Sequence, residues 1–294
     1  MRILISGTSG LIGSAVAAQL ESQGHGITRL VRRAPGLGQV RWDPDVGMIE
    51  AAQLEGFDGV VHLASMSWAR RWTSGFKMQI RHNRLRTNSL LAEALAACTR
   101  RPRVLVCASG QGAYGSSGDQ ILTEDSPVGT DFLATLQRDG EAATAPASAA
   151  GIRVAHLRIP TVLGGPDLAA MAKNVRRIGN GQQWFSWIAR DEMPGVVHHV
   201  LVTDAVSGPV NAASPNPVRY ADLVAASARV LGRKPGAPVP AFLLRLALGE
   251  MADALILASR RLEPSKLLAS GYRFHLPDLE GALRHELASA STSA

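Results

Sequence analysis

Apolar runs and amphipathic stretches alternate through the first half of the chain. Ile3 to Ile5 reads as a short buried strand, Leu11 to Leu20 as an amphipathic helix without proline, and Ile27 to Val31 as a second strand. The alternation continues with predicted strands at 59–64, 103–108 and 152–157 and predicted helices at 76–98 and 132–150. This rhythm predicts an α/β fold with a doubly wound parallel sheet of the Rossmann type, in which ligands bind outside the carboxyl ends of the strands.

The regular alternation ends after residue 158. A turn-rich stretch at 160–166 precedes a predicted helix at 168–178, and a proline-rich link at 235–240 leads to further helices. We therefore expect a Rossmann domain at 1–158 and a smaller C-terminal substrate lobe at 159–290. The lobe is expected to be intertwined with the core rather than to form an independent domain.

A glycine-rich turn joins the first predicted strand to the first predicted helix. It reads Gly7-Thr8-Ser9-Gly10-Leu11-Ile12-Gly13. Glycines in this context let the backbone turn tightly and approach a pyrophosphate, which then binds the N–H groups at the helix N-terminus. Residues 7–13 are therefore predicted to bind a dinucleotide. An ordinary turn between a strand and a helix is the alternative interpretation.

The residues after the second predicted strand indicate which dinucleotide. A site for NAD usually places Asp or Glu here, where the carboxylate accepts a hydrogen bond from the ribose 2′-hydroxyl. This chain has Arg32 and Arg33 instead. A guanidinium group suits a 2′-phosphate, because it offers fixed donors to a dianion. The pattern favours NADP(H), and two solvated arginines are the alternative.

Charge and composition argue against a nucleic-acid-binding protein. The chain of 294 residues carries a formal net charge of +7, but the basic residues are nearly all arginines and are scattered along the sequence. Only 5% of the residues are aromatic, so a stacking platform for bases is not evident. Part of the excess positive charge is expected to serve an anionic cofactor.

No membrane or targeting segment is expected. Met1 leads directly into the first strand, and the apolar stretch 241–258 is interrupted by Arg245, Glu250 and Asp253. We expect a cytoplasmic protein without a membrane partner.

The cysteine and histidine residues give no sign of a metal site. Cys98 and Cys107 are the only cysteines, which argues against a disulfide scaffold or a cysteine cluster. His198 and His199 are adjacent, so on a helix they point in different directions, and no acidic partner lies at ligand spacing. No metal is expected.

Several phrases carry a family resemblance. Gly7 to Gly13 and Val61-His62-Leu63-Ala64 match the extended type of the short-chain dehydrogenase/reductase superfamily. Other phrases are more specific: Arg70-Arg71-Trp72-Thr73, Leu122-Thr123-Glu124-Asp125-Ser126-Pro127, Gln183-Trp184-Phe185-Ser186-Trp187-Ile188, Pro238-Val239-Pro240-Ala241-Phe242, Leu248-Gly249-Glu250-Met251, Gly271-Tyr272-Arg273-Phe274 and Pro277-Asp278-Leu279. With these, the chain resembles the epimerase-like family named after nucleoside-diphosphate-sugar epimerases, which has its own C-terminal extension.

The resemblance implies a Rossmann fold and an NADP(H) cofactor. By position, Val31 and Arg32 match the family's NADP contacts after the second strand, and Leu63 and Ala64 match its contacts at the end of the fourth. Arg84 matches an arginine that the family uses near the cofactor. An ordinary surface arginine on a helix is the alternative at this position.

The usual catalytic pair of the superfamily is missing. Its enzymes commonly place a tyrosine and a lysine four residues apart on one helix, where the ammonium lowers the tyrosine pKa. Tyr114, Tyr220 and Tyr272 are followed four residues later by glycine, valine and leucine. Leu133 and Gln137 lie roughly at the two catalytic places, and neither side chain transfers protons.

Ser109 and Tyr114 are the remaining candidates for catalysis. Ser109 follows the strand 103–108, where the superfamily places its active-site hydroxyl, and Tyr114 is the best phenol near the nicotinamide. The alternatives are a turn serine and an aromatic ring packed at the pocket floor. Gln111 is a further polar candidate. Ala189 replaces the family's usual histidine, so the pocket is expected to differ from that of relatives.

The combined prediction is an NADP(H)-dependent oxidoreductase that acts on a small organic molecule. Without the Tyr-x-x-x-Lys pair, reduction of a polarised C=C or C=N bond demands less of the protein than exchange between an alcohol and a ketone, although C=O reduction stays open. A sugar-nucleotide epimerase and a non-catalytic NADP(H)-binding sensor are the two alternatives. Whether the protein is a monomer or a homodimer is left open.

Overall fold

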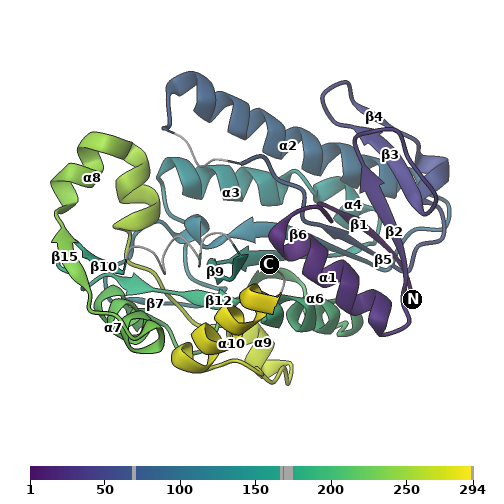
Figure 1. Ribbon diagram of the computed structural model, residues 1–294. Helices are drawn as coiled ribbons and strands as arrows, with labels where there is room; N and C mark the ends of the chain where they lie inside the picture. Colours follow the sequence, from purple (N-terminus) through teal and green to yellow (C-terminus); the bar gives the residue numbers. More distant parts are fainter. Residues whose placement is uncertain (68–70, 166–167, 169–174, 293–294) are drawn as a thin grey trace.

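An eight-stranded sheet forms the centre of the computed structural model, which describes residues 1–67, 71–165, 168 and 175–292 (Figure 1). The strand order is β13-β8-β6-β5-β1-β2-β3-β4. All neighbouring strands are parallel except β3 and β4, which are antiparallel. The bounds are β1 Arg2–Ser6, β2 Gly26–Val31, β3 Gln39–Asp43, β4 Met48–Ile49, β5 Gly59–His62, β6 Val104–Gly110, β8 Arg153–Ile159 and β13 Gly208–Asn211. The predicted Rossmann-type α/β fold is confirmed.

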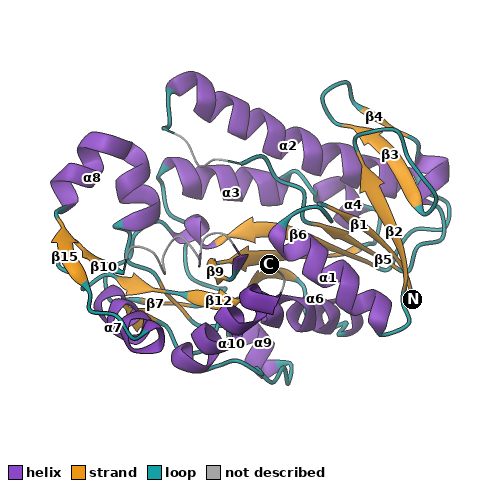
Figure 2. Ribbon diagram, viewed as in Figure 1, coloured by secondary structure: helices purple, strands orange, loops and turns teal. Residues whose placement is uncertain are grey.

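Successive residues of β1 supply two separate cores. Ile3 and Ile5 pack with the core on the side of α1 (Leu11–Ser22) and α6 (Met193–Val202), whereas Leu4 packs with the core on the side of α2 (Ser74–Ala97) and α4 (Ala145–Ala149). A strand that is buried on both faces reads as a continuous apolar run, as this one does. Figure 2 shows the helices covering both faces of the sheet.

The long helix predicted at 132–150 is divided into two. The first part is α3, Phe132–Ala142, which begins after Asp131, whose carboxylate accepts a hydrogen bond from the Ala134 N–H. The second part is α4, which begins after Thr144 and has a proline in its first turn. The break follows from Pro146, because proline has no N–H to donate inside a helix and favours its start.

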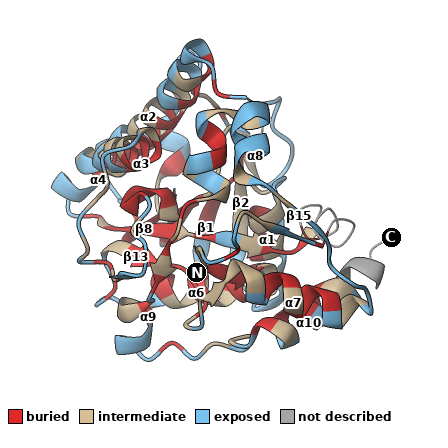
Figure 3. Ribbon diagram, turned by 90° about the vertical axis from the view of Figure 1, so that its left-hand side faces the viewer, coloured by how far each residue is buried: buried red, intermediate tan, exposed pale blue. Residues whose placement is uncertain are grey.

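Short strands and helices build the rest of the chain. They are β7 Ile121–Leu122, β9 Thr161–Leu163, β10 Arg176–Ile178, β11 Trp184–Phe185, β12 Trp187–Ala189, β14 Val218–Arg219, β15 Gly236–Val239, β16 Arg261–Leu262, α7 Tyr220–Leu231, α8 Ala241–Leu248, α9 Ser265–Ala269 and α10 Leu279–Thr292. The helix predicted at 168–178 lies largely outside the described residues, and its last part, Arg176–Ile178, is a strand. Figure 3 shows the buried faces of α7 and α10, whereas α8 contains no buried residue.

The C-terminal segment packs into the central core. Leu267 and Tyr272 belong to the same buried cluster as Ile3. The Glu192 carboxylate accepts hydrogen bonds from the Tyr272 hydroxyl and from the backbone N–H groups of His275 and Leu276. The sequence phrase around Tyr272 therefore has a structural explanation, since it fastens the extension to the start of α6.

No helix in the described part of the chain has both the length and the apolar character needed to cross a membrane.

Candidate dinucleotide site and catalytic pocket

Two glycines allow the turn after β1 to form. Gly7 has φ +78°, and a Cβ placed on it would lie 2.6 Å from the Leu63 carbonyl carbon. A Cβ on Gly13 would lie 2.1 Å from the Gly7 carbonyl oxygen, so α1 approaches the turn too closely for any side chain. At Gly10 a Cβ would meet only the Gly7 oxygen, at 3.4 Å. The turn is tight on its protein side and open at Gly10.

A cavity of about 700 Å³ lies beyond this turn, at the carboxyl ends of β1, β2 and β5. Three segments that contain predicted cofactor residues form part of its wall. The residues are Gly7, Thr8, Ser9 and Gly10 after β1, Val31, Arg32 and Arg33 at the end of β2, and Leu63 and Ala64 after β5. The structure therefore brings together the turn, the arginine pair and the end of β5. Leu11, Ile12 and Gly13 form the first turn of α1 behind the glycines.

Arg32 and Arg33 lie at the β2 end of the cavity. Both side chains are exposed, and neither forms an ion pair or a hydrogen bond with the described residues. Two unpaired guanidinium groups on the wall of an open cavity can receive an anionic group. The open Gly10 and these free donors fit a phosphate-bearing dinucleotide.

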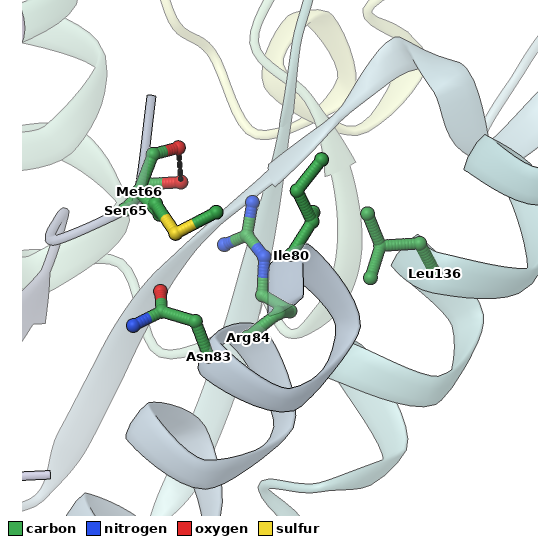
Figure 4. Close-up of a pocket in the computed structure, with 6 residues that line it drawn as sticks. All are labelled: Ser65, Met66, Ile80, Asn83, Arg84 and Leu136. Carbon is green, nitrogen blue, oxygen red and sulfur yellow. Dashed lines mark hydrogen bonds between the residues drawn. The ribbon is translucent and has the colours of Figure 1, made fainter. Parts of the chain in front are cut away.

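Arg84 lies deeper, in a small cavity beside the large one. Its guanidinium is surrounded by Ser65, Met66, Ile80, Asn83 and Leu136, as Figure 4 shows. Ser65, Met66 and Asn83 also line the large cavity. Arg84 is 8% exposed and donates to the Ala108 carbonyl oxygen at 3.1 Å. Burial lowers the pKa of this guanidinium from its ordinary value, although the negative charge of Glu141 opposes the shift. Arg84 is therefore a buried cation rather than a surface arginine.

Ser109 is held by an ion pair that the sequence prediction did not include. Its hydroxyl donates to Glu141 Oε1 at 2.7 Å, and the same carboxylate receives two hydrogen bonds from Arg158, at 3.0 and 2.9 Å. Burial opposes ionisation of Glu141, but the hydrogen bonds and charge of Arg158 outweigh it, so the pKa of Glu141 is lowered. Ser109 thus faces a carboxylate that only accepts, and its proton points to Glu141.

Tyr114 is connected to the same ion pair from the other side. The Arg158 guanidinium lies 4.8 Å from the centre of the Tyr114 ring, and the Tyr114 hydroxyl donates to Asn211 Oδ1 at 2.7 Å. Tyr114 is 4% exposed, and burial raises its pKa despite the nearby charge of Arg158. A proton-donor role for Tyr114 remains a prediction, and it would require the bond to Asn211 to open.

Leu133 and Gln137, the two positions predicted to correspond to the superfamily's catalytic pair, hold a packed side chain and an amide. Leu133 packs against Gly112, where an added Cβ would lie 3.1 Å from the Leu133 Cβ. The Gln137 Oε1 atom lies 3.3 Å from the Ser109 hydroxyl, whereas the buried Nε2 atom finds no partner among the described residues. The Oε1 atom of Gln111 is likewise buried without a described partner.

Sequence reasoning missed Glu141, Arg158 and Asn211. A usable signal existed for the first two, because an arginine at a buried strand position and a glutamate on the neighbouring helix imply a buried pair. Ala189 is buried in β12. The described residues contain no group of three or more potential metal ligands. Arg70, the first residue of the family phrase Arg70-Arg71-Trp72-Thr73, lies outside the described residues.

Comparisons with known proteins agree with the fold. The family described as the NAD dependent epimerase/dehydratase family matches residues 3–213. A second family, described as a domain of unknown function (DUF1731), matches residues 239–286, the region of the predicted extension.

The epimerase family protein ML0860 of Mycobacterium leprae is 34% identical over 294 residues, which cover 96% of this chain and 94% of the relative. The human epimerase family protein SDR39U1 is 31% identical, over 98% of this chain and 100% of its own.

Two solved structures support the same assignment. Human SDR39U1, crystallised with NADPH, superposes with a TM-score of 0.90 at 29% identity and covers 98% of this chain and 99% of its own. The nucleoside-diphosphate sugar epimerase of Corynebacterium glutamicum gives a TM-score of 0.83 at 36% identity, over 98% of this chain and 58% of the larger protein. The resemblance to the extended short-chain dehydrogenase/reductases is confirmed. This chain belongs to the NAD dependent epimerase/dehydratase family.

Proposed function

We propose that this protein is an NADP(H)-dependent oxidoreductase that reduces a polarised C=C, C=N or C=O bond of a small organic substrate. The observation that carries the proposal is the cavity at the carboxyl ends of β1, β2 and β5. A glycine turn forms one wall, and the free Arg32 and Arg33 lie at the β2 end. The human relative crystallised with NADPH supports the choice of cofactor.

The predicted cofactor residues divide into three roles. Gly7 to Gly13 would hold the pyrophosphate with backbone N–H groups at the start of α1. Arg32 and Arg33 would bind the 2′-phosphate, and Leu63 and Ala64 would form the wall at the end of β5. Arg84, buried beside the same cavity, would supply a positive charge deeper in the site. The bound cofactor supplies the hydride.

Ser109 defines which substrate groups suit the pocket. Because its proton is directed to the ionised Glu141, its lone pairs are available to accept a hydrogen bond. A substrate that carries an N–H or O–H group beside the polarised bond therefore suits Ser109 better than a bare carbonyl. Tyr114 or water would supply the proton that the reduced bond takes up. The ion pair of Glu141 and Arg158 keeps the Ser109 hydroxyl in one orientation.

A substrate panel tests this function. Consumption of NADPH would be followed with small enones, imines and ketones, each with and without an N–H or O–H group beside the polarised bond, using the wild type and a Ser109→Ala/Tyr114→Phe double variant. The proposal expects turnover of at least one class and a loss of about 10²-fold or more in the variant, the usual size of a lost acid–base or orienting group. Unchanged turnover in the double variant would remove both residues from the mechanism.

The second candidate is a sugar-nucleotide epimerase. Family membership and the 36% identical Corynebacterium protein, which is named as an epimerase, favour it. The absence of a Tyr-x-x-x-Lys pair weighs against it, because epimerisation needs a base at a sugar carbon. Interconversion of UDP-glucose and UDP-galactose without net change in the cofactor would establish this activity in place of the reductase.

The third candidate is a non-catalytic NADP(H)-binding protein. Ser109 and Tyr114 are 8% and 4% exposed and already hydrogen-bonded within the protein, an arrangement that a purely binding role would also allow. Tight NADPH binding with no turnover across both substrate classes would favour this candidate.

A further inference from the structure

A chain of buried side chains connects the dinucleotide cavity to α3. Ser6 at the end of β1, His62 at the end of β5 and Asn88 in α2 are each at most 3% exposed. The Ala64 N–H, on the cavity wall, donates to Ser6 Oγ at 3.3 Å, and Ser6 Oγ lies 2.7 Å from His62 Nδ1. His62 Nε2 lies 3.1 Å from Asn88 Oδ1, and Asn88 Nδ2 donates to the Gly140 carbonyl oxygen at 2.7 Å.

The two ends of the chain fix the direction of every hydrogen bond in it. A carbonyl oxygen only accepts, so Asn88 faces Gly140 with its amide nitrogen and His62 with its oxygen. His62 Nε2 must therefore carry a hydrogen. In a neutral ring Nδ1 is then the acceptor, and Ser6 donates to it. The Ser6 oxygen is left free to accept the Ala64 N–H.

The surroundings of His62 keep the ring neutral. Burial, with the positive charge of Arg84, lowers the pKa of His62 from 6.5 to about 4, although the hydrogen bond to Asn88 opposes the shift. Trp42 packs against the ring edge-on, with 5.6 Å between ring centres. Ser6 and His62 are also direct partners in the β1–β5 register, so the two side chains lie side by side by construction of the sheet.

We propose that His62, acting through Ser6, is a positioning residue of the dinucleotide site. It holds the part of the cavity wall formed by Ala64 at a fixed distance from the glycine turn. The inference rests on the proposed dinucleotide-binding function. A Cβ on Gly7 would lie 2.7 Å from the Ala64 nitrogen, so the turn and this wall are in direct contact. The hydrogen bond from Ala64 to Ser6 ties the same nitrogen to β1, and the neutral ring holds Ser6 in the orientation that accepts it.

Two neutral substitutions of His62 separate positioning from packing. The amide oxygen of asparagine reaches the place of Nδ1 and gives Ser6 an acceptor, whereas the longer glutamine reaches the place of Nε2 and contacts Asn88 instead. We expect His62→Asn to bind NADPH within about threefold of the wild type in calorimetric titration. We expect His62→Gln to bind about tenfold more weakly, the size of one net hydrogen bond.

Ser6→Ala provides the second arm. It removes the acceptor of the Ala64 N–H and should also weaken NADPH binding about tenfold. Ser227→Ala is the matched control, because Ser227 is a buried serine in α7 whose hydroxyl has no partner among the described residues. The Ser227→Ala variant should bind NADPH with the affinity of the wild type. Thermal melting of every variant separates loss of fold from loss of affinity. If His62→Gln does not fold, the NADPH affinity of Ser6→Ala tests the inference instead.

Two results would overturn the inference. Equal NADPH affinity of His62→Asn and His62→Gln would show that only packing matters at this position, and wild-type affinity in Ser6→Ala would show the same for the hydroxyl. A wild type that binds no NADPH contradicts the proposed function itself, and the inference falls with it. Wild-type binding that all variants retain contradicts the inference alone.

Discussion

At the scale of single residues, the candidate site depends on where a side chain is absent. Gly13 lies so close to the Gly7 carbonyl that one added methyl group would be 2.1 Å from it. Gly10, three residues earlier in the same phrase, has room for a methyl group at 3.4 Å. Two glycines that look equivalent in the sequence therefore carry different constraints, one for the fold and one for the ligand.

Substitution of the two glycines should separate these constraints. We expect Gly13→Ala to lower the free energy of unfolding by about 1–3 kcal/mol or more, because a crowded atom forces the backbone to shift. Gly10→Ala should cost less than about 1 kcal/mol, the scale of an N-cap preference, while weakening NADPH binding, since Gly10 lines the cavity. Urea denaturation measures both values, and equal losses in the two variants would contradict the assignment.

At the scale of elements, one buried ion pair fastens α3 to the sheet. Glu141 in α3 and Arg158 in β8 have side chains that are 12% and 3% exposed. Ser109 in β6 is the register partner of Arg158 in β8, so the helix and both strands meet at one carboxylate.

Removal of one partner should cost more than removal of both. Glu141→Ala would leave Arg158 buried without a counter-charge, and we expect a loss of about 3–5 kcal/mol in unfolding free energy. A Glu141→Met/Arg158→Met double variant should recover most of that loss, because apolar side chains of similar size avoid the desolvation cost. Chemical denaturation of the wild type and of the two variants provides the comparison. A double variant no more stable than Glu141→Ala would mean that the pair itself stabilises the protein.

At the scale of the whole molecule, local and distant interactions differ in how far the sequence predicts them. The turn from Gly7 to Gly13 was predicted because strand, turn and helix are neighbours in the chain. The partners of Ser109 and Tyr114 were not, because Glu141 and Asn211 lie 32 and 97 residues away and meet them only in the folded chain. The break before α4 was missed because helical periodicity on either side of Pro146 looks continuous. The domain division at 158 remains a prediction.

Stability should fall as the pH falls below neutrality. The folded pKa of His62, about 4, lies below its ordinary value of 6.5, because burial and the charge of Arg84 disfavour the protonated ring. Above 6.5 both states are neutral and the contribution of His62 is complete. Between 6.5 and about 4 the unfolded chain takes up a proton that the folded chain does not, so stability is lost. His25, His156 and His199, whose pKa values burial also lowers, act in the same direction.

Thermal melting across this range measures the effect. We expect the melting temperature to fall with pH in the wild type and to fall less steeply in His62→Asn, which cannot be protonated there. Parallel slopes in the two proteins would show that His62 does not contribute.

The central claim, that the cavity binds NADP(H), is tested most directly by calorimetric titration with NADPH and NADH. The wild type, Arg32→Ala and an exposed control on α10, Arg284→Ala, would be compared. The account predicts that NADPH binds about 10- to 100-fold more tightly than NADH, the size of a charge-assisted contact, and that only Arg32→Ala loses this preference. Equal affinity for the two dinucleotides in the wild type would contradict the phosphate site, and no binding of either would contradict the dinucleotide site as a whole.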